Sequence, residues 1–227
     1  MTLGDSVLEW HQIDLKKHLH WLMQILQQNL DGTEANRTRT ISKMEKWINQ
    51  LEYIIERVYD IEKNLTPKIE SIFGVSFAEQ ELFTISLFQP STKNIFLELQ
   101  AHYCKGNDNR IDCNAMPELA SLSEVSQMLA LLGDAAIDMA VLHLVWKPRA
   151  SDVGTLTQDR ADVVSNEHLS KKCDEWKLYD NLIHFDPMTP SKSEMEHDKG
   201  TLVEALYGVL YVEYGFEKVR ELVGHLL

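Results

Sequence analysis

Residues 129–146 read Leu129-Ala-Leu-Leu-Gly-Asp-Ala-Ala-Ile-Asp-Met-Ala-Val-Leu-His-Leu-Val-Trp146. This apolar run predicts a long helix, and it contains two acids, Asp134 and Asp138. Because the two acids are four residues apart, they lie on one face of that helix, one turn from each other. A carboxylate within so apolar a segment costs free energy unless it is paired or holds a metal ion. The stretch therefore predicts a core helix that carries a functional or ion-paired acidic face.

A second apolar stretch near the C-terminus has the same unusual feature. It reads Thr201-Leu-Val-Glu-Ala-Leu-Tyr-Gly-Val-Leu-Tyr-Val-Glu-Tyr-Gly215, with Glu204 alone on its apolar first half. If the two predicted helices pack together, Asp134 and Glu204 can face each other and hold a hard divalent cation. Mg²⁺ takes carboxylate and water oxygens at roughly 2.0–2.1 Å. The glycines beside these acids, Gly133 and Gly208, are expected to permit a close helix approach.

Three segments together resemble the ribonuclease III domain. They are Leu131-Leu-Gly-Asp-Ala135, Arg160-Ala-Asp-Val-Val-Ser-Asn-Glu-His-Leu169 and Val203-Glu-Ala-Leu-Tyr-Gly-Val-Leu-Tyr211, in the order and spacing of that family. The resemblance extends approximately from Ser71 to Leu227. It implies an all-α endonuclease domain that hydrolyses RNA phosphodiesters with Mg²⁺, for which Mn²⁺ substitutes. It also implies a homodimer, because this family pairs two domains about a twofold axis.

The resemblance also assigns residues to the site. The second acid of the central helix corresponds to Asp134 and the last acid of the later helix to Glu204, so these two are the predicted catalytic and metal-binding residues. Two other acids of the family fall on Ala130 and Thr201, so half of the usual set is absent. A glutamate that precedes them falls on Gln127. The short Mini-III branch, which lacks a double-stranded-RNA-binding domain, has a similarly reduced outline.

The remaining predicted site residues have supporting roles. Asp138, Thr201 and Gln127 are expected to orient the metal-binding acids from outside. Lys171, Lys172 and Lys199 are the predicted RNA contacts.

Simpler structural roles compete with several of these assignments. Thr201 and Glu204 also fit a capping box at a helix start, although the domain match favours the metal role for Glu204. For Asp138, an ion pair with a nearby Arg or Lys is favoured over direct metal contact. Ser165 and Asn166 are expected to organise a helix junction through hydrogen bonds from side chain to backbone.

Composition limits the classes of function. The 227 residues carry a formal net charge of -13, which argues against indiscriminate nucleic-acid binding; RNA contact then needs a local basic patch, and no DNA partner is expected. The N-terminus has no signal-peptide pattern, and no uninterrupted apolar run reaches ~20 residues, so no membrane span is expected. Three widely spaced cysteines predict no disulfide framework, so Cys104 and Cys113 are expected to be free thiols in a polar loop of a cytoplasmic protein. A zinc site at His102 and these cysteines lacks a fourth ligand.

The predicted domain organisation is a helical hairpin extension, residues 1–70, followed by the ribonuclease III-like domain, residues 71–227. Helical periodicity covers about Ser6 to Leu30 and about Ser42 to Asn64, and Pro67 and Gly74 mark the join. The apolar stripe of the hairpin, which includes Trp21, Trp47 and Leu51, is too large for a free appendage.

Downstream, helical patterns cover Phe77 to Tyr103 with a turn at Phe88–Ser91, and a helix from about Thr155. A loop is predicted from Asn181 to Glu196. The last helices are expected from about Lys199 to Tyr214 and from Phe216 to Leu227, with a break at Gly215.

From these observations we expect a Mg²⁺-dependent endoribonuclease that cleaves double-stranded or structured RNA in RNA processing. The alternative is a catalytically inactive RNA- or ribosome-associated interaction protein that kept the fold. An unrelated helical-bundle hydrolase is a distant third.

Overall fold

The computed structural model describes residues 10–104, 111–146, 152–185 and 189–227. In these ranges the chain is helical, with a single isolated parallel bridge between Phe88 and Ile183. The predicted all-α fold is confirmed. The elements are α1 (Leu15–Asp31), α2 (Thr38–Asp60), η1 (Ile61–Leu65), α3 (Thr66–Phe73), α4 (Gln80–Ile85), η2 (Pro90–Thr92), α5 (Lys93–Tyr103), α6 (Ala115–Ala120), α7 (Leu122–Val145), α8 (Val153–Val164), α9 (Asn166–Trp176), η3 (Tyr179–Asn181), α10 (Lys192–Leu222) and η4 (Val223–Leu226).

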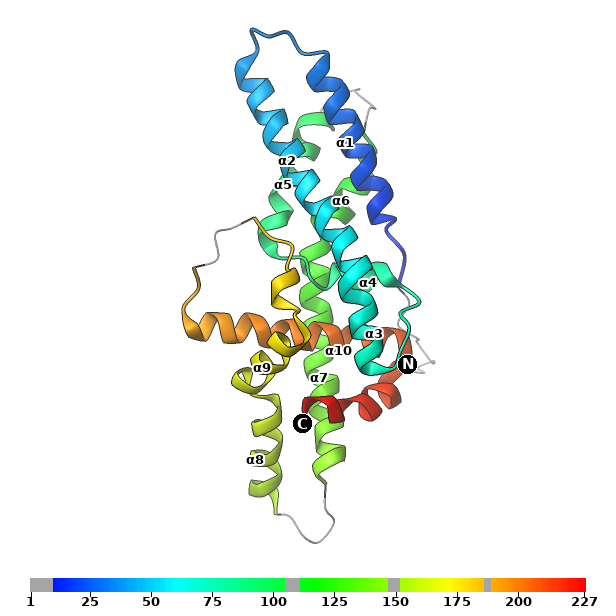
Figure 1. Ribbon diagram of the computed structural model, residues 1–227, viewed down its shortest axis with the longest axis vertical. Coiled ribbons are helices and arrows are strands. Elements are labelled where there is room, and N and C mark those ends of the chain that lie inside the picture. Colours follow the sequence, from blue (N-terminus) through cyan, green and yellow to red (C-terminus); the bar gives the residue numbers. More distant parts are fainter. Residues whose placement is uncertain (1–9, 105–110, 147–151, 186–188) are drawn as a thin grey trace, which may run out of the picture.

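The molecule is elongated, with α7 along much of its length (Figure 1). The hairpin of α1 and α2 lies at one end together with α5 and α6, and α8 extends toward the other end. Helix α10 runs across α7 near the middle, and these two helices form the most extensive contact between described elements. The α7–α10 crossing is therefore the centre of the domain.

The hairpin is longer than predicted, because α2 continues through the π-helical turn η1 into α3. Pro67 does not interrupt this run. It directly follows the π-helical turn, in which the Thr66 N–H bonds to the carbonyl of Ile61 five residues back, so the α-helical bonding that proline disrupts is already altered there. The helical run ends at Gly74, which has a φ of 62° that glycine adopts without steric cost. The proposed boundary at residue 70 thus falls inside α3 and stays a prediction.

The hairpin packs on the rest of the chain, as its apolar stripe predicted. Leu19, Trp47 and Leu51 are fully buried and belong to the same hydrophobic cluster as the core of α7 and α10. The Trp47 indole N–H donates to Glu98 of α5 at 2.8 Å. At the start of α1, Glu81 of α4 accepts from two backbone N–H groups at 2.6 and 2.7 Å. The hairpin is therefore part of the domain core.

Helix α10 begins earlier than predicted. Ser191 caps it, and Ser191 and Glu194 form a reciprocal capping box, the Ser-x-x-Glu pattern of a helix start. The predicted loop to Glu196 is wrong in its last residues, and Thr201 lies inside the helix, so Thr201 is not a helix cap. The predicted break at Gly215 is confirmed by its non-helical φ of 78°.

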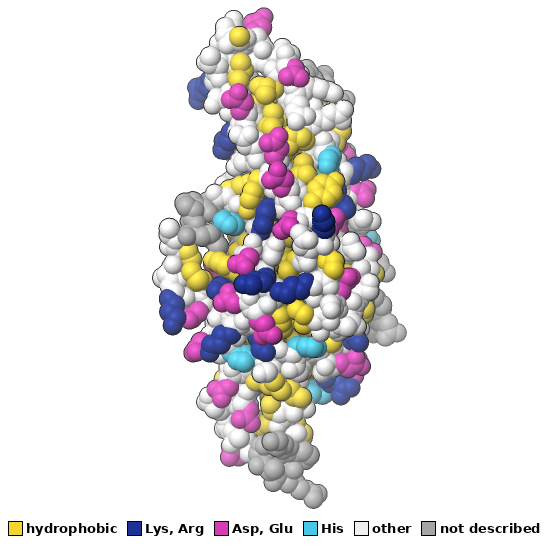
Figure 2. All heavy atoms as spheres, in the orientation of Figure 1, with side chains coloured by type: hydrophobic (Ala, Val, Ile, Leu, Met, Phe, Trp, Pro, Cys, Tyr) yellow, Lys and Arg dark blue, Asp and Glu magenta, His cyan; other side chains and the backbone are white. Residues whose placement is uncertain are grey.

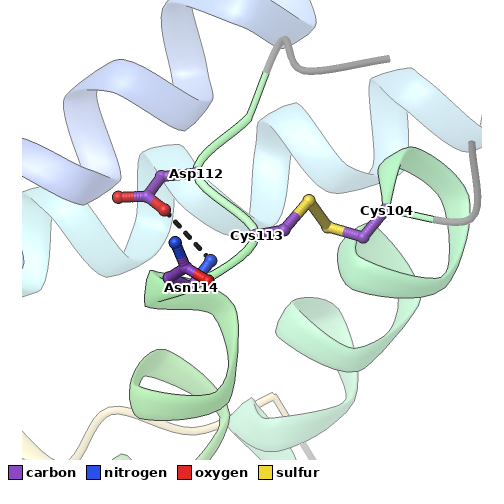
Figure 3. The surroundings of a disulfide bond; sticks show 4 residues. All are labelled: Cys104, Asp112, Cys113 and Asn114. Carbon is purple, nitrogen blue, oxygen red and sulfur yellow. Dashed lines mark hydrogen bonds between the residues drawn. A yellow bond between two sulfur atoms is a disulfide. The ribbon is translucent and has the colours of Figure 1, made fainter. Parts of the chain in front are cut away.

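The expectation of two free thiols is wrong. Cys104 and Cys113 form a disulfide with a Cα–Cα distance of 5.8 Å (Figure 3). The ends of α5 and α6 lie close together and bring the two side chains within bonding distance, which wide spacing in the sequence did not reveal. Cys173, in contrast, is buried and free, and burial raises the pKa of its thiol to about 12.

By length and composition, α7 would be able to cross a membrane. The core helix of a folded domain has the same properties, and α7 makes its main contact with α10. The absence of a membrane span therefore stays a prediction.

The burial of α2 makes a first prediction. Leu51→Ala should lower the free energy of unfolding by about 2–5 kcal/mol, because it removes fully buried methyl groups and leaves a cavity. Glu52→Ala, at an exposed neighbouring position, is the matched control and should change the stability by less than about 0.5 kcal/mol. Urea unfolding measures both. Equal stability of the two variants would mean that the hairpin does not share the core.

Candidate active site

Two glycines allow the backbones of α7 and α10 to touch where the helices cross. A Cβ atom on Gly133 would lie 1.8 Å from the carbonyl oxygen of Glu204, and one on Gly208 would lie 2.0 Å from the carbonyl oxygen of Leu129. Real Cβ atoms do not approach backbone this closely, so any side chain at either position would force the helices apart. The expected role of both glycines is confirmed.

The crossing brings the two predicted metal-binding acids together. Asp134 follows Gly133 on α7 and is exposed, whereas Glu204 on α10 is half-buried. Burial, followed by repulsion from Asp134 and Asp138, raises the pKa of Glu204 from 4.5 to about 7. Burial and the charge of Asp138 also raise the pKa of Asp134, against an opposing effect of Arg160. The charges of Asp134 and Asp138 therefore both disfavour ionisation of Glu204, and the charge of Asp138 disfavours ionisation of Asp134.

The third acid is ion-paired. A carboxylate oxygen of Asp138 lies 2.8 Å from a guanidinium nitrogen of Arg160 on α8. The structure thus favours the ion-pair interpretation of Asp138 over direct metal contact. Arg160 belongs to the second sequence motif, but its partner does not follow from the sequence, because only the packing of α8 beside α7 shows which acid it meets.

The other predicted supporting residues lie on the same two helices. Gln127 is exposed on α7, and Thr201 is half-buried one turn before Glu204 on α10. Ala130, which takes the place of an acid in the family pattern, is buried. The orienting roles of Gln127 and Thr201 stay predictions.

A small set of hard oxygen donors is available for a metal ion. Within the described ranges, no group of three or more His, Cys, Asp or Glu side chains is arranged to hold one. Asp134 and Glu204 nevertheless fit a hard cation in type, since carboxylate oxygens are the ligands that Mg²⁺ prefers. Their mutual repulsion is the feature that a cation would relieve. A bound ion would need water for its remaining coordination positions.

The three lysines predicted to contact RNA are all ion-paired in the structure. Lys171 lies 2.9 Å from Glu167, and Lys172 lies 3.7 Å from Glu175. Lys199 lies 2.7 Å from Asp174, with its side chain only 13% exposed, and so links α10 to α9. Basic and acidic side chains are interspersed on the face that Figure 2 shows. The RNA contacts of these lysines stay a prediction, and Lys199 has a clear structural role.

The predicted junction at Ser165 and Asn166 is confirmed for Ser165. Its hydroxyl accepts from the backbone N–H of His168 and caps α9. The carboxamide oxygen of Asn166 lies 2.6 Å from where a Cβ on Gly200 would be, so Asn166 packs directly against α10. These contacts fix α8 and α9 relative to the crossing.

Residues 127–215, which include the α7–α10 crossing and the α8–α9 junction, match the family model of the Ribonuclease III domain. The match identifies a ribonuclease III domain within these residues. The resemblance seen in the sequence motifs is therefore confirmed.

Known proteins are similar to this chain over part of their length. It is 30% identical to Ribonuclease 3 of Mycoplasma genitalium over 115 residues, which are 50% of this chain and 42% of that protein. It is 33% identical to Ribonuclease 3 of Bacteroides thetaiotaomicron over 97 residues, which are 42% of this chain and 30% of that protein. The chain thus spans less than half the length of these curated relatives.

Among solved structures, a nuclease domain of ribonuclease III from Campylobacter jejuni is similar to this chain. It matches with 21% identity and a TM-score of 0.46, over 70% of this chain and 93% of that one.

The glycine contact makes a second prediction. Gly208→Ala should lower the free energy of unfolding by about 3 kcal/mol, because its Cβ collides with backbone that cannot move aside. Gly224→Ala is the control, since nothing lies within 4 Å of its Cβ position. Thermal and urea unfolding compare the two variants. A Gly208→Ala protein as stable as the control would refute the close crossing.

The raised pKa of Glu204 makes a third prediction, for metal-free protein in a chelator. Because the folded state binds this proton more tightly than the unfolded chain, the resulting stability is present below the ordinary pKa of 4.5 and is lost as the pH rises through about 7. Relative to Glu204→Gln, the wild type should lose about 1–3 kcal/mol between about pH 5 and about pH 8, a range reduced for partial exposure. Parallel pH profiles would contradict the shift.

Proposed function

We propose that this chain is an endoribonuclease that hydrolyses phosphodiester bonds in double-stranded or structured RNA, in RNA processing, with Mg²⁺ as cofactor and Mn²⁺ as a substitute. One observation carries the proposal: within the matched domain, the α7–α10 crossing couples the carboxylates of Asp134 and Glu204 electrostatically. The cytoplasm is the proposed location.

In this proposal, Asp134 and Glu204 hold the cation from two different helices. A bound divalent ion lowers the pKa of a coordinated water and stabilises negative charge on phosphate oxygens. Asp134 is exposed and can therefore meet a phosphodiester that approaches from solvent. Glu204 is anchored beside the glycine contact, which keeps its backbone fixed. Holding the acids on rigid helices limits the reorganisation that the reaction requires.

The proposed assembly is a homodimer. An apolar surface stripe on α7 supports it: Met128, Leu131 and Met139 are 60%, 73% and 51% exposed. Large apolar side chains grouped on one helix face mark interaction surfaces. In a twofold dimer, the stripe of one chain would pack against the stripe of its partner, so both would be removed from solvent. Two sites would then lie in one assembly, suited to the two strands of a duplex.

A second candidate is a non-catalytic interaction protein that binds structured or ribosomal RNA. It is favoured by the residues that replace acids of the family, Ala130 and Thr201, and by the neutralisation of Asp138 through Arg160. RNA cleavage separates the two functions directly.

The endoribonuclease proposal makes a fourth prediction. The purified protein should cleave an end-labelled RNA duplex with Mg²⁺ or Mn²⁺, and Asp134→Asn should lower the rate about 100-fold or more, because it removes a negative charge with little change of shape. Glu118→Gln is the control, because Glu118 is an exposed acid on α6. Duplex binding without cleavage by the wild type would support the interaction protein. Equal cleavage by wild type and Asp134→Asn would place the activity elsewhere.

The homodimer makes a fifth prediction. Leu131→Gln should shift the protein toward monomer in light scattering after size-exclusion chromatography, because it adds a polar group to the stripe. Val153→Gln is the control, since Val153 is 81% exposed on α8, outside the stripe. A wild type that is monomeric, or a Leu131→Gln protein that dimerises equally well, would contradict the proposed interface.

A further inference from the structure

One cation of the protein itself lies among the acids of the proposed site. Asp134 and Asp138 come from α7 and Glu204 from α10, and Arg160 of α8 pairs with Asp138 at 2.8 Å. Neither partner of this pair is fully exposed, with side chains 35% and 33% accessible. The guanidinium of Arg160 is a permanent positive charge.

We propose that Arg160 is a positioning residue that neutralises Asp138 and limits the site to one divalent cation per chain, held between Asp134 and Glu204. This inference rests on the proposed function and specifies how many metal ions the site would bind.

Charge balance is the first argument. Three carboxylates and one guanidinium leave two negative charges at the crossing, and one divalent cation balances them. A second divalent ion would leave the site with a positive excess. It would also need a carboxylate, and Asp138 is already held by Arg160. Breaking a partly buried pair leaves a charge without its partner, which costs free energy.

The lack of further donors is the second argument. The positions from which the family pattern supplies additional acids hold Ala130, which is buried, and Thr201. Over the residues that the structure describes, no cluster of three or more metal-ligating side chains exists. Neither position supplies a carboxylate for a second ion, whereas Arg160 adds a fixed positive charge beside Asp138.

The field of Arg160 also reaches beyond its direct partner. It opposes the rise in the pKa of Asp134 that burial and Asp138 cause. Asp138 in turn repels both Asp134 and Glu204. Removing either member of the Arg160–Asp138 pair should therefore change the cation affinity of the other two acids, and the two removals should act in opposite directions.

The test is a Mn²⁺ titration of the full chain, with free ion counted by electron paramagnetic resonance and with no RNA present. The wild type should bind one Mn²⁺ per chain. Asp138→Asn leaves the charge of Arg160 unbalanced and should weaken Mn²⁺ binding about tenfold. Arg160→Gln should tighten it by a similar factor or admit a second ion. The double variant should return close to the wild-type affinity and stoichiometry, because both charges are gone.

Controls separate charge from folding. Arg220→Gln removes the guanidinium of a surface pair with Glu217 and should leave Mn²⁺ binding unchanged. Arg160→Lys keeps the charge and should keep one ion per chain. Thermal melting in chelator reports whether each variant is folded, and if Arg160→Gln does not fold, the Arg160→Lys and Asp138→Asn results decide.

Three outcomes would overturn the inference. A wild type that binds two ions, or an Asp138→Asn protein with unchanged affinity, refutes the role of Arg160 while the proposed function stands. A folded wild type that binds no Mn²⁺, in which the Glu204→Gln change also has no effect, refutes the metal site itself and with it the proposed function.

Discussion

Backbone contact between α7 and α10 is the constraint on which the rest of the structure depends. Gly133 contacts the carbonyl of Glu204, and Gly208 contacts that of Leu129. The missing side chain on each helix therefore leaves room for the backbone of the other. The contact explains why the acids lie beside the glycines. The close approach of the backbones brings a short side chain such as Asp134 near enough to repel Glu204 on the other helix. The same residues therefore determine both packing and chemistry.

That packing has an electrostatic consequence. Acids placed at a helix crossing lose part of their hydration, which raises the pKa of Glu204 and of Asp134. The chain relieves one of three repelling charges internally, through Arg160. Among the residues that the structure describes, Asp134 and Glu204 form no such ion pair, although Arg160 also acts on Asp134. A structural ion-pair network would be expected to neutralise them all, so the remaining negative charge supports the proposed binding of an external cation.

The sequence predicted what depends on local pattern. Helix periodicity, the break at Gly215 and the joint position of Asp134 and Glu204 followed from spacing and from the family motifs. Contacts between distant segments were beyond it. The partner of Asp138 depends on how α8 returns beside α7, and the disulfide depends on how α5 meets α6. Local signals were also misread: Pro67 was treated as a break, although the helical run continues past it after a π-helical turn.

The early start of α10 shows how such a misreading affects functional interpretation. Proline and Ser/Thr residues between Asn181 and Glu196 indicated a loop, and that made Thr201 a possible helix cap. The capping box at Ser191 instead places Thr201 about two and a half turns inside α10. There its hydroxyl is not required to cap the helix, so it is available on the face that leads to Glu204. Thr201 lies one turn before Glu204 on the same helix, which is compatible with the predicted role of its hydroxyl in orienting water around a bound ion, and that role stays a prediction.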